Sequence, residues 1–135
     1  MTNSEPVKVA HMFAEAINHQ NVDTICELMS EEHVFIDSLG TRIEGRAAMR
    51  RGWEGYFRMV PDYTITIQDT FVKGTTVVML GTAQGTYSAN GVLTQENRWS
   101  TPAAWRALIH DSLVAEWQVY VDNEPIRQIM AKGQK

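Results

Sequence analysis

The stretch WSTPAAWRALIHDSLVAEWQVYV, residues 99–121, decides the fold. Apolar side chains recur at every second position before and after the polar tripeptide 110–112, which is the period of a strand with one buried face. The tripeptide favours a turn, so the stretch predicts a hairpin of two long antiparallel strands. Pro102 has no N–H to donate to a neighbouring strand, and it therefore predicts a bulge or an edge position. In the second strand, the alternation places Leu113 and Ala115 on the same apolar face as Trp117.

The period of two continues towards the N-terminus. Residues 63–71 alternate between apolar and polar, with Ile67 and Phe71 on one face, and residues 76–87 predict the next strand. Lys73-Gly74 separates these two strands, and Asn90-Gly91 is a strong signal for a tight hairpin. Residues 63–121 therefore predict four long antiparallel strands.

Before Pro61 the apolar residues follow a helical period instead. Residues 4–17 and 46–60 predict two amphipathic helices, with a shorter helix from about residue 22 between them. Residues 33–37 predict a short strand, residues 42–45 a brief second one, and residues 122–125 the cap of a terminal helix. Gly52 and Gly55 weaken the helix over 46–60, and close approach of another backbone would explain them.

Helices and strands are segregated along the chain, which predicts an α+β fold. We expect a single domain over residues 1–135, because this length suits one core and the sequence contains no linker or repeat. Long strands that carry a bulge curve strongly. We therefore expect a curved antiparallel sheet wrapped around the N-terminal helices, forming a cone with an internal pocket.

Charge and composition exclude several classes of partner. The chain has 12 basic and 16 acidic residues and a net charge of −4, so no general attraction draws it to nucleic acid or to an anionic membrane. No stretch approaches the roughly 20 apolar residues of a membrane span. Residues 1–6 have neither the basic nor the apolar region of a secretory signal, so a cytoplasmic location is expected. Cys26 is the single cysteine, which excludes an intrachain disulfide. The basic ridge between Arg42 and Arg58 is either a solvated helix face or a surface for an acidic ligand.

Aromatic residues supply the lining for an internal pocket, although each of them could equally be ordinary core. We expect the ligand-contacting set to be Phe13, Phe35, Trp53, Phe57, Trp99 and Trp117. In a strand, His33, Phe35 and Asp37 share one face, so Asp37 points inward if Phe35 does. A carboxylate beside an apolar cavity is a stronger base than one in water. The alternative is that Asp37 begins the turn 37–40 and caps its own backbone.

Five segments resemble the nuclear transport factor 2-like superfamily, and within it the SnoaL-like domains related to polyketide cyclases. They are residues 13–18, 22–29, 33–40, 44–49 and 114–123. The resemblance covers nearly the whole chain and implies a cystatin-like α+β barrel. It is specific for the fold and weak for function, because the superfamily contains isomerases, cyclases, epoxide hydrolases, dehydratases and non-catalytic binders.

The ketosteroid isomerases of this superfamily hold their general base in an Asp-x-x-Gly turn after the first strand, and Asp37 matches that position. Their oxyanion donors have no match, because the Tyr position falls on Phe13 and the position of the protonated Asp falls near Ala103. The resemblance therefore implies an Asp base and argues against steroid isomerisation. The Asp-Arg-Asp network of the epoxide hydrolases has no match around Arg98 or Arg106.

Polyketide cyclases of the superfamily use an acidic residue as base in an aldol ring closure, and this implies Asp122 as a second candidate. Strand alternation places Asp122 on the face opposite Trp117, and a role as cap of the terminal helix explains it otherwise.

We therefore expect an isomerase-, cyclase- or dehydratase-like acid–base enzyme for a small hydrophobic carbonyl compound. Asp37 is the expected base, with His33 tuning it or relaying its proton. The missing oxyanion donors leave open a non-catalytic binder of a hydrophobic ligand or a dimeric assembly module. The histidines show no metal-ligand spacing and no glycine-rich phosphate loop occurs, so we expect neither a metal nor a cofactor. Because relatives often pair sheet to sheet, a homodimer through the sheet is expected.

Overall fold

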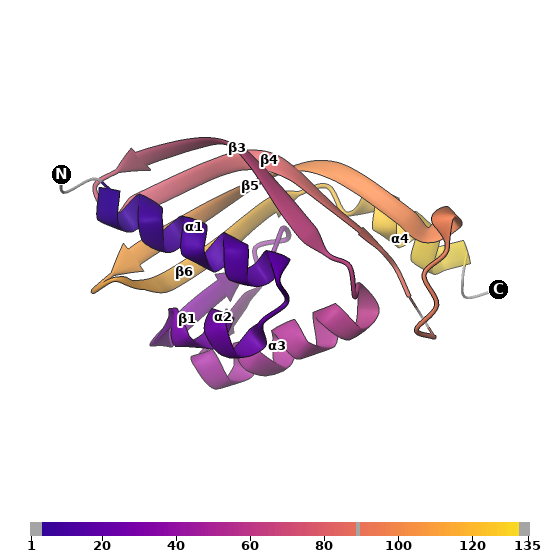
Figure 1. The fold of residues 1–135 in the computed structure, drawn as a ribbon, viewed down its shortest axis with the longest axis horizontal. Helices are drawn as coiled ribbons and strands as arrows, with labels where there is room; N and C mark the ends of the chain where they lie inside the picture. Colours follow the sequence, from indigo (N-terminus) through magenta and orange to yellow (C-terminus); the bar gives the residue numbers. More distant parts are fainter. Residues whose placement is uncertain (1–3, 89, 133–135) are drawn as a thin grey trace.

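Helices and strands follow one another in the order that the sequence predicts (Figure 1). The computed structural model describes residues 4–88 and 90–132. The helices are α1 (Ser4–Asn18), α2 (Val22–Glu27), α3 (Arg46–Met59) and α4 (Glu124–Lys132). The strands are β1 (Met29–Ile36), β2 (Arg42–Glu44), β3 (Thr64–Lys73), β4 (Thr76–Thr86), β5 (Arg98–His110) and β6 (Leu113–Val121), and a 3₁₀ turn spans Gln95–Asn97.

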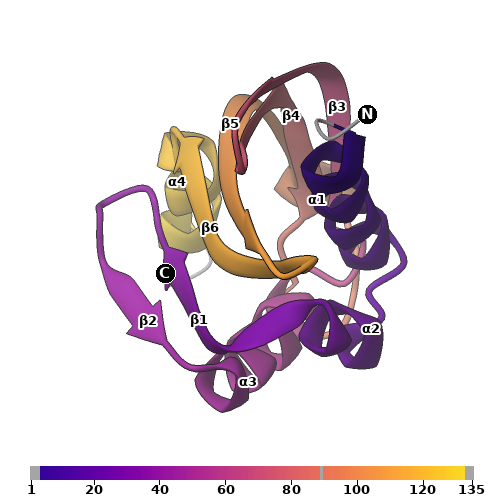
Figure 2. The same cartoon turned by 90° about the vertical axis from the view of Figure 1, so that its left-hand side faces the viewer.

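The six strands form one sheet in the order β2-β1-β6-β5-β4-β3. All neighbours are antiparallel except β1 and β6, which run parallel, so the sheet is mixed rather than wholly antiparallel. Its two edges, β2 and β3, do not pair with each other, and Figure 2 shows the open sheet curling past α1, α2 and α3. The result is the α+β cone that the sequence predicts.

Bulges change which side chains of β3 and β6 face the core. In β3 the register breaks between Ile67 and Asp69, so Phe71 is 59% exposed and Val72 packs against the core instead. The expected inward position of Phe71 was wrong for this reason: one extra residue in a bulged strand exchanges its two faces.

In β6 the register breaks opposite Leu108 and Ile109, which leaves Ala115 as the extra residue. Val114 is therefore fully buried on the face of Trp117, in place of Leu113 and Ala115. At Pro102 the β4–β5 register continues without a bulge, and this residue lies one position beyond the last β5–β6 pair, Ala103 and Val121. Pro102 therefore lies neither at a bulge nor on an edge strand: it is in the interior strand β5, at a point that β6 does not reach.

Close backbone approach occurs in the sheet and not in α3. A Cβ atom at Gly81 would lie 1.7 Å from the carbonyl oxygen of Thr66 on the bulged strand, so this position requires glycine. At Gly52 an added Cβ would meet only the flexible end of Met49, at 3.4 Å, and at Gly55 only the side chain of Arg58, at 3.7 Å. The expectation that another backbone explains the two helical glycines was therefore wrong.

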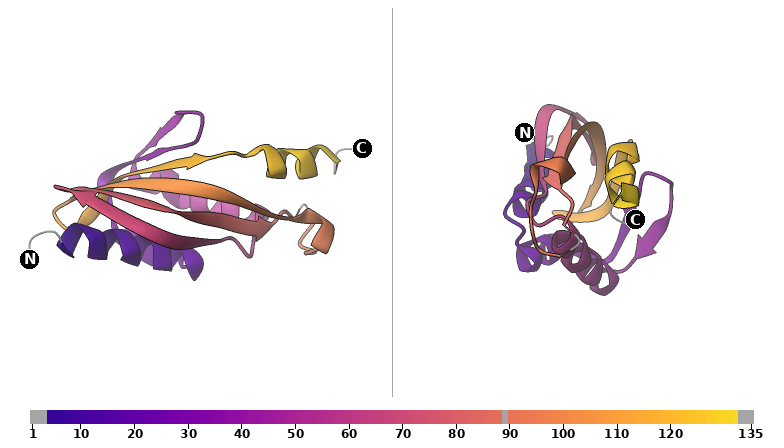
Figure 3. Two further views of the ribbon diagram at one scale, coloured as in Figure 1. Left: turned by 90° about the horizontal axis from the view of Figure 1, so that it is seen from above. Right: turned by 90° about the vertical axis from the view of Figure 1, so that its right-hand side faces the viewer.

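The core lies between the concave face of the sheet and the helices. Phe13 of α1 is fully buried and packs on Trp117 of β6, with their ring centroids 4.7 Å apart. Asn21 caps α2 by accepting the N–H of Thr24. Figure 3 shows, seen from above, the long strands running beside α1, with α4 extending beyond them at the C-terminal end.

The connection between β4 and β5 is longer than a tight hairpin. Asn90-Gly91 lies within it, where the Asn90 side chain accepts the N–H of Val92 at 3.2 Å, and the 3₁₀ turn follows before β5 begins. The two-residue hairpin expected at this point was therefore wrong. Among the residues that the structure describes, no helix is both long and apolar enough to cross a membrane.

Candidate functional site

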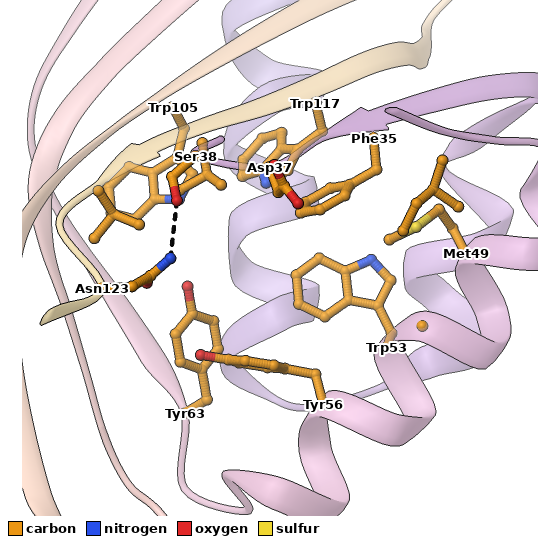
Figure 4. Close-up of a pocket in the computed structure, with 14 residues that line it drawn as sticks. Phe35, Asp37, Ser38, Met49, Trp53, Tyr56, Tyr63, Trp105, Trp117 and Asn123 are labelled. Atoms are coloured by element: carbon orange, nitrogen blue, oxygen red, sulfur yellow. Dashed lines mark hydrogen bonds between the residues drawn. The ribbon is translucent and has the colours of Figure 1, made fainter. Parts of the chain in front are cut away.

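A cavity of about 280 Å³ opens between the end of β1, α3, the start of β3 and the strands β5 and β6 (Figure 4). Aromatic and apolar side chains form most of its wall. The lining residues are Phe35, Asp37, Ser38, Ile43, Met49, Gly52, Trp53, Tyr56, Tyr63, Trp105, Trp117, Val119, Val121 and Asn123. Among these described lining residues, Asp37 is the only one with a carboxyl group or any other group charged at neutral pH.

Asp37 directly follows β1 and is held by the turn that it begins. Its Oδ1 accepts the backbone N–H groups of Leu39 and Thr41, each at 2.9 Å. Within residues 4–88 and 90–132, Oδ2 accepts no hydrogen bond, and the side chain lines the same cavity as Phe35 and Trp117 (Figure 4). The two alternatives for Asp37 therefore coexist: one oxygen caps the turn while the side chain lines the cavity.

Two tyrosines form a further part of the wall (Figure 4). Tyr56 lies in the last turn of α3 and Tyr63 immediately before β3, and their rings meet edge to face with centroids 4.9 Å apart. Burial raises the pKa of both phenols well above the ordinary value, and for Tyr63 the proximity of Tyr56 adds a smaller rise. Both hydroxyl groups therefore stay protonated and are able to donate a hydrogen bond.

At the other side of the cavity, Asn123 Nδ2 donates to the hydroxyl of Ser38 at 2.8 Å. This bond joins the turn after β1 to the loop before α4, two segments that are far apart in the sequence. Sequence reasoning missed Tyr56, Tyr63, Ser38 and Asn123 as parts of a site. The nearest signal was the helical spacing of Tyr56 from Trp53, and the others had none.

The aromatic residues expected to contact a ligand divide into two groups. Phe35, Trp53 and Trp117 line the cavity, together with Trp105. Phe13, Phe57 and Trp99 are not part of the lining. Phe13 belongs to the core below Trp117, Phe57 stacks on Trp53 with centroids 5.4 Å apart, and Trp99 lies 6.1 Å from the ring of Tyr63.

The structure does not bring His33 to Asp37. His33 is fully buried outside the cavity lining, with Nδ1 2.7 Å from the carbonyl oxygen of Val114 and its ring 6.0 Å from that of Phe13. Four residues of extended strand separate Cα atoms by about 13 Å, so the shared face does not place His33 beside Asp37. Burial lowers the pKa of His33, against smaller opposing effects of Val114 and Glu116.

Asp122 is likewise placed away from the cavity. It is exposed, and its Oδ1 accepts the N–H of Glu124 at 2.9 Å, which caps the first turn of α4. The neighbouring Asn123 lines the cavity in its place. In the described part of the chain, no group of three His, Cys, Asp or Glu side chains is arranged to hold a metal ion.

An open α+β cone with an internal aromatic cavity is the class of protein that this geometry defines. The model of the SnoaL-like domain family matches residues 9–117. The chain therefore belongs to the SnoaL-like family, within the nuclear transport factor 2-like superfamily. No curated protein sequence matches the chain.

Solved structures share this fold at low sequence identity. A proposed SnoaL-like polyketide cyclase from Shewanella denitrificans OS-217 is 15% identical, with a TM-score of 0.80 over 94% of this chain and 97% of that one. An LEH-like epoxide hydrolase from M. tuberculosis is 15% identical, with a TM-score of 0.78 over 98% of this chain and 93% of that one. A protein with a ketosteroid isomerase-like fold from Catenulispora acidiphila DSM 44928, solved with trimethylamine, is also 15% identical, with a TM-score of 0.75 over 87% and 88% of the two chains. At this identity the likeness shows the fold alone.

Proposed function

We propose that the protein is an acid–base enzyme that removes a proton next to the carbonyl group of a small hydrophobic compound, with Asp37 as the general base. The observation that carries this proposal is one carboxylate in an otherwise uncharged cavity with a mostly aromatic and aliphatic wall. An apolar wall favours a hydrophobic substrate, and a single base near it suits proton abstraction from carbon. Isomerisation, ring closure and dehydration all begin with this step.

The dimensions of the cavity support a small substrate. Its volume of about 280 Å³ is just below the range of about 300–1,000 Å³ that is usual for ligand pockets. Similar structures include a proposed polyketide cyclase and an epoxide hydrolase, both of which are named for reactions of small organic molecules. The hydrolase chemistry is less well supported here, because Arg106 pairs with Glu116 and is not among the cavity-lining residues.

Deuterium exchange of an enolisable ketone tests the proposal without knowledge of the final product. We expect the protein to accelerate exchange of the α-hydrogens of cyclohexanone and 2-decalone in D₂O, followed by NMR, and Asp37→Asn to abolish the acceleration. Asparagine retains a side-chain oxygen that can accept the N–H groups of Leu39 and Thr41, so the turn persists while the base is lost.

Asp122→Asn is the matched variant, because Asp122 also accepts a backbone N–H within a cap. The Asp122→Asn variant should accelerate ketone exchange as much as the natural chain does. If Asp122→Asn lost this acceleration and Asp37→Asn kept it, the base would be Asp122 instead. Binding of the ketones without any acceleration of exchange would favour a non-catalytic binder.

We also propose that two copies pair through the outer face of the sheet. The register places Leu80, Ala104 and Tyr120 in one row across β4, β5 and β6. Leu80 is 40% and Tyr120 51% exposed, and an apolar row of this kind on an extended sheet is typical of an interaction surface.

A further inference from the structure

Asn123 lies at the cap position of α4, but its side chain does not cap the helix. Its carbonyl oxygen accepts the N–H of Arg127 at 2.9 Å, as the residue before a helix does. An asparagine at this position usually also accepts a backbone N–H of the first turn through its side chain. In the part of the chain that the structure describes no such bond forms, and Nδ2 donates to the Ser38 hydroxyl at 2.8 Å instead. Departures of this kind from a local rule are typical of functional sites.

The bond between Asn123 and Ser38 leaves one donor and one acceptor unused. The Ser38 oxygen accepts from Asn123, so the hydrogen of its own hydroxyl can still be donated. The side-chain oxygen of Asn123, Oδ1, accepts no hydrogen bond from the described residues. Both side chains line the cavity. A hydroxyl group is the simplest ligand group that uses both positions, because its oxygen accepts one hydrogen bond while its hydrogen forms another.

Both members of this pair lie on backbone that is already ordered. Ser38 is inside the turn that Asp37 begins, where the N–H of Gly40 donates to the Asp37 carbonyl oxygen at 2.9 Å. Asn123 directly follows Asp122, whose side chain accepts a backbone N–H at the start of α4. Because both segments are fixed before a ligand arrives, a ligand group that binds to them costs little conformational entropy.

The pair lies at one end of the cavity, and the opposite end is apolar. Figure 4 shows Ser38 and Asn123 on one side of the space and Trp53 and Met49 on the other. A ligand that fills this cavity of about 280 Å³ therefore meets aromatic and aliphatic carbon at one end and hydrogen-bonding groups at the other. A few placed polar groups in a mostly apolar pocket fix the orientation of a ligand.

We propose that Ser38 and Asn123 form a subsite for a hydroxyl group of the substrate. The inference rests on the proposed function and narrows its substrate to a small hydrophobic ketone that carries a hydroxyl group apart from its carbonyl. The Ser38 hydroxyl donates to the oxygen of that group, and Asn123 Oδ1 accepts its hydrogen. Neither residue acts on the reacting carbon. The pair determines which ketones bind and how they lie, whereas Asp37 removes the proton.

Three fluorescent probes that differ in one substituent test the subsite by binding alone. They are 2-naphthol, whose hydroxyl is both donor and acceptor, 2-methoxynaphthalene, which keeps only the acceptor, and naphthalene, which has neither. We expect the natural chain at pH 7 to prefer 2-naphthol to naphthalene by about 10-fold, because each neutral hydrogen bond contributes roughly 2- to 12-fold in affinity. The affinity for the methoxy compound should lie between the other two.

Two variants remove the two hydrogen-bonding groups separately. Asn123→Leu removes the acceptor and nearly keeps the size of the side chain, and Ser38→Ala removes the donor. We expect each to reduce the ratio of 2-naphthol to naphthalene affinity by roughly 2- to 12-fold. A general change in the shape of the cavity cancels in this ratio, because both probes fill the cavity with the same rings.

Asn97→Leu is the matched control. Asn97 also donates through Nδ2 to a loop oxygen, the carbonyl of Tyr87 at 3.2 Å, but it does not line the cavity. This variant should keep the affinity ratio of the natural chain, and thermal unfolding of each variant checks that the fold persists. An equal fall of the ratio in Asn97→Leu would attribute the effect to the loops in general and overturn the subsite.

Ketone exchange links the subsite to the proposed function. Cyclohexanone and 4-hydroxycyclohexanone share the reacting carbonyl group, and only the second carries a hydroxyl group. We expect kcat/KM for deuterium exchange to be about 10-fold higher for the hydroxyketone, and Asn123→Leu to reduce this ratio as it reduces the ratio of affinities. Asp37→Asn should abolish the exchange of both ketones.

Two results would overturn the inference and leave the proposed function intact. One is a natural chain that accelerates cyclohexanone exchange but binds 2-naphthol no more tightly than naphthalene. The other is a preference for 2-naphthol that neither Asn123→Leu nor Ser38→Ala changes by as much as twofold. Absence of exchange with both ketones, with the preference for 2-naphthol intact, would instead overturn the proposed function and support the pair as a binding site for a hydroxyl group.

Discussion

At the scale of single residues, the two oxygens of Asp37 have different surroundings. Oδ1 holds the backbone N–H groups of Leu39 and Thr41, which fixes the carboxylate relative to the strand that carries it. The oxygen left without a protein partner belongs to a side chain in the cavity wall. A turn cap thus serves as a positioning device, because a side chain bonded to its own turn loses little further freedom on meeting a ligand.

His33 predicts a pH dependence of stability. Burial holds the pKa of the folded histidine below its ordinary value, and the unfolded value is about 6.5. The folded chain therefore binds fewer protons than the unfolded chain below about pH 6.5. Stability should be fully present above that pH and decrease as the pH falls from 6.5 towards the lower folded pKa. Urea unfolding between pH 8 and pH 5 measures this decrease.

His33→Asn should flatten that profile, because asparagine keeps a donor near the Nδ1 position but does not titrate. At pH 8 it should cost roughly 1–3 kcal/mol of stability through lost packing of a fully buried ring. His110→Asn is the matched control, since the His110 side chain is 77% exposed. An unchanged slope in His33→Asn would assign the acid sensitivity to other groups.

At the scale of elements, the sequence predicted the order of helices and strands but not every face. Long amphipathic runs such as residues 46–60 are recognisable as helices from the period of their apolar residues, and α3 forms there. Local composition does not indicate where a bulge adds a residue. The alternation therefore predicted the wrong face of the sheet for Phe71 and Val114. The cavity shows the same limit. The position of Asp37 in the cavity wall is predictable from the alternation of its own strand. Tyr63 reaches the cavity because segments distant in the sequence pack together, and the pattern of a single strand does not contain that information.

The helical glycines of α3 give a prediction at this scale. Gly52→Ala and Gly55→Ala should each raise the free energy of unfolding by up to about 1 kcal/mol, because alanine is the better helix former and neither site has a backbone nearby. Gly81→Ala should instead lower it by about 1–3 kcal/mol or more, since its Cβ would overlap the Thr66 carbonyl. Urea unfolding measures all three.

The two glycines differ in one respect, because Gly52 lines the cavity and Gly55 does not. Gly52→Leu should therefore weaken binding of 2-naphthol while Gly55→Leu leaves it unchanged. Equal effects of the two leucine variants would show that Gly52 does not limit the space for a ligand.

At the scale of the whole molecule, the concave and convex faces of the sheet differ in what covers them. The concave face packs on Phe13 and its neighbours in α1. The convex face carries the row Leu80, Ala104 and Tyr120, with Phe71 59% exposed further along β3. Arg106 and Glu116 form an ion pair beside this row, and their opposite charges offset each other. The pair therefore causes little electrostatic repulsion between two copies of the chain.

The proposed pairing of two copies predicts a mass of twice 15.3 kDa in sedimentation equilibrium at micromolar concentration. Leu80→Lys should shift this equilibrium towards the monomer, because a two-fold interface would bury the new charge twice without a partner. Val92→Lys is the matched control: Val92 is 57% exposed, but it lies in the β4–β5 connection away from the row. A natural chain that sediments at 15.3 kDa would contradict the dimer. If Leu80→Lys left the dimer intact, the interface would have to lie on another face. Because the cavity opens on the other side of the sheet, the monomeric variant should still catalyse ketone exchange.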